Sequence, residues 1–360
     1  MSDALADLDG HLRSLAGNDE LSGVVLFQRG SRTVFERAYG WASRTWRIPM
    51  TLDMRFDCAS ITKLFTAIAT LQRVDVGDFD LDTSAIDFLG LGGTAISPAV
   101  TVRHLLTHTS GIADDADEEA GERYEDLFVE KANYTEIATA DHLPDFVFKP
   151  PNFAPGEGCR YCNGGFILLG LMVEKATGTT YRDYVRTHVF ARAGMTRSGF
   201  FRMDEVVTGV AEPCEPVRDE AGAITGWRRN IYSYPPIGSP DGGAHVTAGD
   251  LVRFVQALRD HTLLPSPLAE AMVTPQVEWY RSPRTGALHM HGFGCRMQVD
   301  DGGDVVWWGK EGINVGVSAE VAYYPRHDVT TVVLCSSEHG AWGPIETIEE
   351  LVLSGALDNQ

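Results

Sequence analysis

The chain has 360 residues, a formal net charge of −20 and 44% hydrophobic residues, a composition typical of soluble globular proteins with room for a sizeable core. The acidic excess argues against binding a nucleic-acid backbone or an anionic membrane surface, because both attract clusters of Lys and Arg. No run approaches the ~18 apolar residues of a membrane span. The N-terminus also lacks the basic start and apolar segment of a secretory signal, so we expect a cytoplasmic protein.

The first 75 residues combine two helices and a hairpin. Apolar residues recur at helical spacing near the N-terminus, at Leu5, Leu8, Leu12 and Leu15. Residues 22–30 and 32–41 read as two strands joined by a tight turn, a β-hairpin. The stretch 56–72 then shows the apolar period of a helix.

Helices and loops are expected through the middle of the chain, residues 76–240. Helical patterns end at glycines suited to a left-handed cap and cover 97–111, 163–178 and 180–194. A further helix is predicted over 247–260. The acidic run at 113–126 is expected to be a solvated surface loop, because like charges repel and stay hydrated.

The C-terminal part returns to strands. Alternating and β-branched patterns separated by turn residues predict strands over 291–299, 304–309, 316–325 and 328–337, before a last helix over 343–353. Strands at both ends of the chain with helices between them predict an α+β fold built on one antiparallel sheet. The sheet domain would combine residues 1–75 and 241–360, and 76–240 would form a mostly helical region.

Ser60 and Lys63 raise the first question of function. They lie three residues apart at the start of an apolar helix, on one face. Two interpretations are open: a capping serine with a solvated lysine, or an activated serine nucleophile with lysine as its proton partner. The alternative serine elbow of α/β-hydrolases is excluded, because its nearest match, 316–320, lacks the last glycine and lies in a predicted strand.

Histidine and cysteine patterns do not indicate a metal site. His104 and His108 are four residues apart but lack the glutamate of H-E-x-x-H and a third ligand, which favours packing in a helix. The histidines of 289–291 read as an ordinary strand edge. Cys159 and Cys162 form a C-x-x-C without a second pair, so free thiols are expected rather than a zinc site or disulfides. We therefore expect no metal and no cofactor.

Three short motifs, taken together and in this order, resemble those of one family. They are Ser-x-x-Lys at 60–63, Tyr-x-Asn at 161–163 and Lys-x-Gly at 310–312. In these the chain resembles the serine β-lactamase and penicillin-binding-protein superfamily, above all its class C branch with related esterases and D-amino-acid peptidases. The resemblance runs from about Leu21 to Ser336. It implies an antiparallel sheet flanked by helices, with the active site between the sheet and the mostly helical region.

The resemblance also implies roles for individual residues. Ser60 would be the nucleophile, and Lys63 and Tyr161 would move its proton, with the base left open between them. Backbone N–H groups of Ser60 and Ile313 would form the oxyanion hole. The residues expected to bind or orient the substrate are Asn163, Lys310, Glu311 and Gly312. A cation at Lys310 is expected to move the pKa values of Tyr161 and Lys63 towards neutrality.

Glu311 departs from the family pattern, which has Thr or Ser at this position. A carboxylate there would repel anionic substrates, unless it pairs with Lys310 or Arg296 and serves only structure. With the absence of a leader, this favours an intracellular serine hydrolase, an esterase or amidase acting through an acyl-enzyme on neutral or amine-bearing small molecules. The alternatives are a D-stereospecific aminopeptidase or amidase, a weak β-lactamase, and a non-hydrolytic penicillin-binding sensor. The sequence leaves the acyl group, the leaving group and the oligomeric state open.

Overall fold

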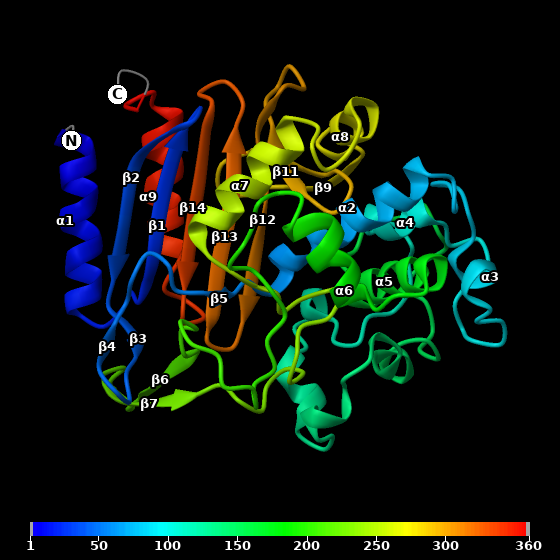
Figure 1. The fold of residues 1–360 in the computed structure, drawn as a ribbon, viewed down its shortest axis with the longest axis horizontal. Helices are drawn as coiled ribbons and strands as arrows, with labels where there is room; N and C mark the ends of the chain where they lie inside the picture. Colours follow the sequence, from blue (N-terminus) through cyan, green and yellow to red (C-terminus); the bar gives the residue numbers. More distant parts are fainter. Residues whose placement is uncertain (1–2, 358–360) are drawn as a thin grey trace.

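The computed structural model describes residues 3–357, which form a large antiparallel sheet with helices on both faces and a helix-rich region beside it (Figure 1). The strands of this sheet are β1 (Gly23–Arg29), β2 (Arg32–Tyr39), β9 (Val277–Arg281), β10 (Leu288–His291), β11 (Arg296–Val299), β12 (Val305–Asn314), β13 (Val317–Tyr324) and β14 (Val329–Cys335). Their order is β2-β1-β14-β13-β12-β11-β10-β9. Because β1 pairs with β14, strands from the two ends of the chain are neighbours, which confirms the predicted α+β fold.

Three short strand pairs accompany the sheet. They are β3 (Trp41–Ser43) with β4 (Ile48–Pro49), β5 (Phe56–Asp57) with β8 (His245–Val246), and β6 (Cys214–Arg218) with β7 (Ile224–Arg229). The pair β5–β8 lies directly before the predicted nucleophile, so it anchors the segment that carries Ser60.

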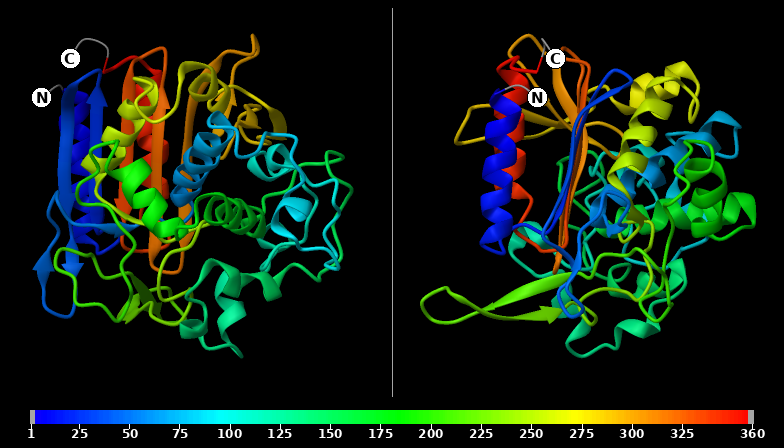
Figure 2. Two further views of the ribbon diagram at one scale, coloured as in Figure 1. Left: turned by 45° about the vertical axis from the view of Figure 1, so that its right-hand side comes forward. Right: turned by 60° about the vertical axis from the view of Figure 1, so that its left-hand side comes forward.

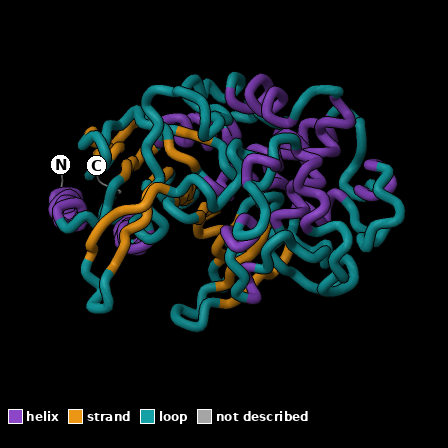
Figure 3. Tube along the Cα trace, turned by 90° about the horizontal axis from the view of Figure 1, so that it is seen from below, coloured by secondary structure: helices purple, strands orange, loops and turns teal. Residues whose placement is uncertain are grey.

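The α-helices are α1 (Asp3–Gly17), α2 (Thr62–Asp75), α3 (Ala85–Leu89), α4 (Val102–Leu106), α5 (Asn163–Thr177), α6 (Tyr181–Val185), α7 (Ala248–Arg259), α8 (Ser266–Met272) and α9 (Trp342–Leu353). Shorter helical turns are η1 (Ala59–Ile61), η2 (Glu118–Ala120), η3 (Tyr124–Phe128), η4 (Asn133–Thr135), η5 (Thr139–Asp145) and the π-helical η6 (Arg186–Phe190). Figure 2 shows α1 and α9 on one face of the sheet and α2 and α7 on the other. Seen from below, most helices of the helix-rich region gather on the side away from α1 (Figure 3).

Both faces of the sheet are covered by apolar cores. Along β1 the side chains alternate, as a strand requires: Val24 and Leu26 join the core beneath α2 and α7, whereas Val25 and Phe27 join the core beneath α1 and α9. On the α2 side, all residues from Thr62 to Gln72 are buried, including a lysine. A helix buried on every side is a rigid mount for the residues at its start.

The middle of the chain is less helical than predicted. The helix expected over 97–111 is only the short α4, because it ends where His108 takes a positive φ of 58°. The hairpin β6–β7 was missed, since its strands are half exposed and lack the apolar alternation that marks a strand. It projects from the body of the molecule (Figure 2). The division into two domains stays a prediction. Within the described range, no helix has the length and apolar character that crossing a membrane requires.

Candidate active site

Ser60 lies in η1, the tight turn between β5 and α2. The turn is held by the N–H of Ala59, which donates to Asp57 Oδ1 at 2.7 Å, and Ala59 itself has a positive φ of 41°. Strained backbone of this kind persists where the surrounding structure holds it in place, and it is concentrated at functional sites. The N-cap of α2 is Ile61 and not Ser60. The interpretation of Ser60 as an ordinary capping serine is therefore wrong.

Ser60 Oγ is instead bonded to both predicted proton partners. It lies 2.6 Å from Tyr161 Oη and 3.1 Å from Lys63 Nζ. The lysine is fully buried, which contradicts the alternative of a solvated side chain. Residues more than 100 positions apart in sequence thus meet at one hydroxyl, in the geometry that activation of a serine requires.

Lys63 is held by two fixed oxygen atoms besides the serine. Its Nζ donates to Asn163 Oδ1 and to the carbonyl oxygen of Asp241, each at 2.7 Å. Burial lowers the pKa of Lys63, although the negative charges of Asp241, Glu118 and other carboxylates oppose this effect. The lysine is therefore easier to deprotonate than an exposed one.

Tyr161 does not follow the expected direction. Burial raises its pKa well above the usual value, and the charge of Glu118 adds to this, whereas the hydrogen bond with Ser60 works the other way. Lys63 Nζ and Lys310 Nζ each lie 4.8 Å from the centre of the tyrosine ring. The prediction that these cations would move the pKa of Tyr161 towards neutrality is wrong, because desolvation of the phenolate outweighs them.

Lys310 and Glu311, neighbours on β12, point to different sides of the sheet. Lys310 is buried near Tyr161, and burial lowers its pKa to about 7. Glu311 Oε2 lies 2.5 Å from Arg296 Nη1, and Arg296 also faces Glu320 Oε2 at 3.9 Å. Of the two interpretations of Glu311, the ion pair with Arg296 is the one that the structure contains. A role of Glu311 in substrate binding remains a prediction without a contact to support it.

Gly312 lies directly against the serine turn. A Cβ at this position would be 2.2 Å from the carbonyl oxygen of Cys58 and 3.1 Å from the Ser60 nitrogen. Only glycine allows this close approach, which brings the next residue, Ile313, to the wall of the same cavity as Ser60. Their backbone N–H groups remain the predicted oxyanion hole.

The cavity over Ser60 has a volume of about 240 Å³ and an acidic lining. Its wall includes Glu118, Glu122, Glu125 and Glu338 besides Asn163 and Ile313. The prediction of a solvated loop over 113–126 is wrong for its first part. Asp114 and Asp115 are buried, and Asp114 accepts the N–H groups of Asn163 and Gly164 at 2.8 and 2.9 Å. Asp114 thereby satisfies the first N–H groups of α5, and the rest of the loop reaches the cavity.

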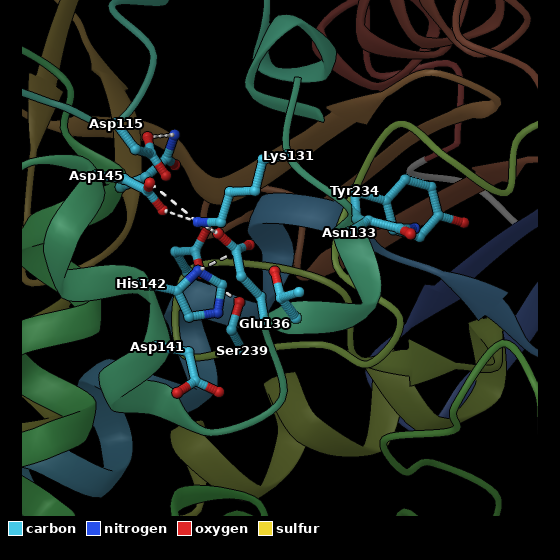
Figure 4. A network of polar contacts seen from close by, with 12 residues as sticks. Asp115, Lys131, Asn133, Glu136, Asp141, His142, Asp145, Tyr234 and Ser239 are labelled. Atoms are coloured by element: carbon cyan, nitrogen blue, oxygen red, sulfur yellow. Dashed lines mark hydrogen bonds and ion pairs between the residues drawn. The ribbon is translucent and has the colours of Figure 1, made fainter. Parts of the chain in front are cut away.

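A second polar network lies beside Tyr234, another residue of the cavity wall. Figure 4 shows Lys131 between Glu136 and Asp145, and its Nζ lies 2.8 Å from Asp145 Oδ2. Asn133, from the same segment, donates to the carbonyl oxygens of Ile231 and Tyr234 at 3.0 and 2.9 Å.

The two hydrogen bonds of Asn133 hold the start of the loop 231–241, which ends at the backbone carbonyl that binds Lys63. Within the loop, Ser239 Oγ lies 2.5 Å from Asp241 Oδ1. The loop also carries the Asp241 carbonyl oxygen that binds Lys63. Sequence reasoning gave no role to Asp241 or Asp114, because no motif marks a residue that acts through its backbone or as a cap.

The antiparallel sheet flanked by helices and the Ser60–Lys63–Tyr161 arrangement define the class of the protein: serine hydrolases of the β-lactamase and penicillin-binding type. The family model described as Beta-lactamase matches residues 8–353, and the chain belongs to this family.

Named relatives agree with this assignment. The chain is 30% identical to Esterase EstB of Burkholderia gladioli over 75% of this chain and 72% of that protein. It is 28% identical to D-aminopeptidase of Brucella anthropi over 79% of this chain. The crystal structure of a penicillin binding protein from Bacillus halodurans superposes with a TM-score of 0.86 and 38% identity, over 95% of this chain and 100% of that one. The chain spans about half of some curated relatives, 52% of the D-aminopeptidase and 57% of Penicillin-binding protein 4* of Bacillus subtilis.

Proposed function

We propose that the protein hydrolyses small esters or amides through an acyl-enzyme on Ser60. The observation that carries this proposal is the hydrogen bonding of Ser60 Oγ to both Tyr161 Oη, at 2.6 Å, and Lys63 Nζ, at 3.1 Å. A serine in a cavity wall, bonded to two groups that can accept and return its proton, is a nucleophile poised for acyl transfer.

In this proposal Lys63, as the neutral amine, is the base for acylation. A neutral amine has two N–H donors and one lone pair, and the two donors match the oxygens of Asn163 and Asp241 at 2.7 Å. The lone pair then faces Ser60 Oγ. The lowered pKa of Lys63 and the raised pKa of Tyr161 support the same assignment.

The remaining steps follow from this assignment. Ser60 Oγ forms a bond to the substrate carbonyl carbon while its proton moves to Lys63. The oxyanion that results accepts hydrogen bonds from the backbone N–H groups of Ser60 and Ile313. The bond to the leaving group breaks as Tyr161 Oη donates a proton to that group and regains one from Lys63. Water then cleaves the acyl-enzyme by the reverse proton path.

Neutral or amine-bearing substrates fit the cavity better than anionic ones. The carboxylates in its wall disfavour a negative charge on the substrate and favour an ammonium group. Glu118 is one of these carboxylates: desolvation raises its pKa, and the charges of Lys63 and Lys310 oppose this effect. The named relatives include an esterase and a D-aminopeptidase, which supports the same range of substrates.

A side-by-side panel tests the proposal: p-nitrophenyl esters, D-amino-acid p-nitroanilides with a free amine, and a chromogenic cephalosporin. We expect turnover of the first two classes and little of the third, whose carboxylate meets the acidic wall. A stable acyl-enzyme on Ser60 without turnover of any class would instead indicate a penicillin-binding sensor. A cytoplasmic location stays a prediction, which fractionation of the source cells tests.

A further inference from the structure

Tyr161 lies against a buried histidine that the proposed chemistry does not use. His108 is 2% exposed, and its ring centre is 4.7 Å from that of Tyr161, with an angle of 35° between the planes. The same imidazole lies 5.2 Å from the ring centre of Phe166 and 4.9 Å from that of His291. The tyrosine ring is therefore supported by a packed histidine on one side.

His108 also holds the backbone on both sides of Tyr161. Its carbonyl oxygen accepts the N–H of Arg160 at 2.9 Å, and its Nδ1 accepts the N–H of Cys162 at 3.1 Å. A neutral imidazole that accepts at Nδ1 carries its proton on Nε2. Burial keeps the ring neutral, because it lowers the pKa of His108 well below the usual value, with the charges of His291, Lys310 and Lys63 acting in the same direction.

The backbone of His108 is adapted to this position. Its φ of 58° lies in the left-handed region, which residues other than glycine adopt rarely. His108 follows Thr107, the C-cap of α4, and its ring lies on Tyr161. Because His108 is not a glycine, this strained backbone conformation must be stabilised by the packing and hydrogen bonds around it.

The contacts continue from His108 and return to Tyr161. The ring of His291, on β10, lies 4.8 Å from that of Trp279, on β9. Trp279 Nε1 donates to Glu119 Oε1 at 3.3 Å, and the same oxygen accepts the N–H of Tyr161 at 3.0 Å. A closed circuit of five residues, which returns through the backbone N–H of Tyr161, thus connects the tyrosine to the sheet and to the acidic loop.

We propose that His108 is a positioning residue that fixes Tyr161 for proton transfer at Ser60, with His291, Trp279 and Glu119 behind it. The inference rests on the proposed function of Tyr161. His108 is not among the residues that line the cavity, so the proposal has it act through the tyrosine. Its loss should reduce the rate of acylation and leave substrate binding nearly unchanged.

Two variants separate the contributions of His108. His108→Ala removes both the ring and the Nδ1 acceptor, whereas His108→Asn retains an acceptor near the position of Nδ1 and tolerates the left-handed backbone. We expect kcat, per titrated active site, to fall about tenfold to a hundredfold in His108→Ala, with KM changed less than about threefold. Acylation by a fluorophosphonate should slow in parallel, and His108→Asn should recover part of the loss.

The matched control is His104→Asn. His104 lies in the same segment and also accepts a backbone N–H at Nδ1, from Thr101 at 3.2 Å, but this bond caps α4 and is not directed at Tyr161. His104→Asn should lower thermal stability without a change in kcat. If His108→Ala does not fold, the kcat and acylation rate of His108→Asn, with its ring removed, decide the question.

A double-mutant cycle with Tyr161→Phe shows whether His108 acts through the tyrosine. In the Tyr161→Phe background, His108→Ala should have little further effect on kcat. Wild-type kcat and acylation in His108→Ala, or an equally large loss in both backgrounds, would overturn the inference. If Tyr161→Phe alone retained wild-type turnover, the proposed function of Tyr161 would fail, which distinguishes the two failures.

Discussion

The two faces of β12 place charged side chains in opposite environments. On the face towards Tyr161, Lys310 is buried 4.8 Å from the centre of the tyrosine ring, and burial lowers its pKa to about 7. On the opposite face, its neighbour Glu311 is paired with Arg296 at 2.5 Å. Burial beside a like charge shifts the pKa of a group, as is common at functional sites, whereas an ion pair stabilises the charged forms of both partners. Two adjacent residues of one motif thus have separate surroundings. We expect substitutions of the proton partners beside Lys310 to change rates, and substitution of Glu311 to change stability but not rates.

The largest effect is expected from Lys63 and Tyr161, the proton partners of Ser60. Lys63→Ala and Tyr161→Phe should each lower kcat by roughly two to four orders of magnitude, the range of general acid–base groups. Steady-state kinetics with the best ester of the panel measures the loss, and circular dichroism confirms folding. Near-normal turnover in either folded variant would remove that residue from the mechanism.

Substitution of Glu311, on the other face of β12, should change the stability of the protein. Glu311→Gln removes the nearer of the two carboxylates that face the partly buried Arg296, which should reduce the free energy of unfolding by about 1–3 kcal/mol. Urea denaturation measures this change, and the preference among the three substrate classes should stay as in the wild type. Glu346→Gln is the matched control, since its pair with Arg284 is exposed and contributes little. A changed substrate preference in Glu311→Gln would restore the view that this carboxylate selects substrates.

The acidic wall of the cavity should control selectivity. Glu118→Gln removes one negative charge from the cavity wall, which should lower kcat/KM for amine-bearing anilides relative to neutral esters by about tenfold, the size of one charge contact. Glu220→Gln, in the exposed turn of the β6–β7 hairpin, should leave this ratio unchanged. An equal ratio in Glu118→Gln and wild type would show that Glu118 does not bind the substrate ammonium.

The smallest effect concerns the pH dependence of stability. The pKa of Lys310 is lowered from 10.5 to about 7 in the folded protein. Between pH 7 and pH 10.5 this lysine is protonated to a larger extent in the unfolded chain than in the folded protein. Its contribution therefore makes the free energy of unfolding rise with pH. Lys310→Met should therefore be more stable than wild type below pH 7, by at least about 1 kcal/mol, and the difference should shrink towards pH 10. Melting curves at several pH values measure it, with the exposed Lys175→Met as control. A difference that does not vary with pH would contradict the lowered pKa.

The sequence predicted what regular patterns encode. Period-two strands at both chain ends predicted the sheet, and three spaced motifs predicted that Ser60, Lys63 and Tyr161 would meet. It could not predict the direction of the Tyr161 pKa, because that depends on how completely tertiary packing removes water from the ring.

Contacts that depend on register were predicted only as alternatives. Arg296 was one of the two partners left open for Glu311, and the pairing of β11 with β12 brings these two side chains together. The acidic run over 113–126 predicts a solvated loop, because the sequence does not show which distant backbone N–H groups a carboxylate will meet in the fold. Asp114 is buried since it finds two of them at the start of α5.

The central claim is that Ser60 is an activated nucleophile, and intact-mass analysis after incubation with a fluorophosphonate tests it most directly. The account predicts one covalent adduct on the wild-type protein, none on Ser60→Ala, and much slower labelling of Lys63→Ala. A label that persists on Ser60→Ala, or a wild-type protein that stays unlabelled, would contradict it.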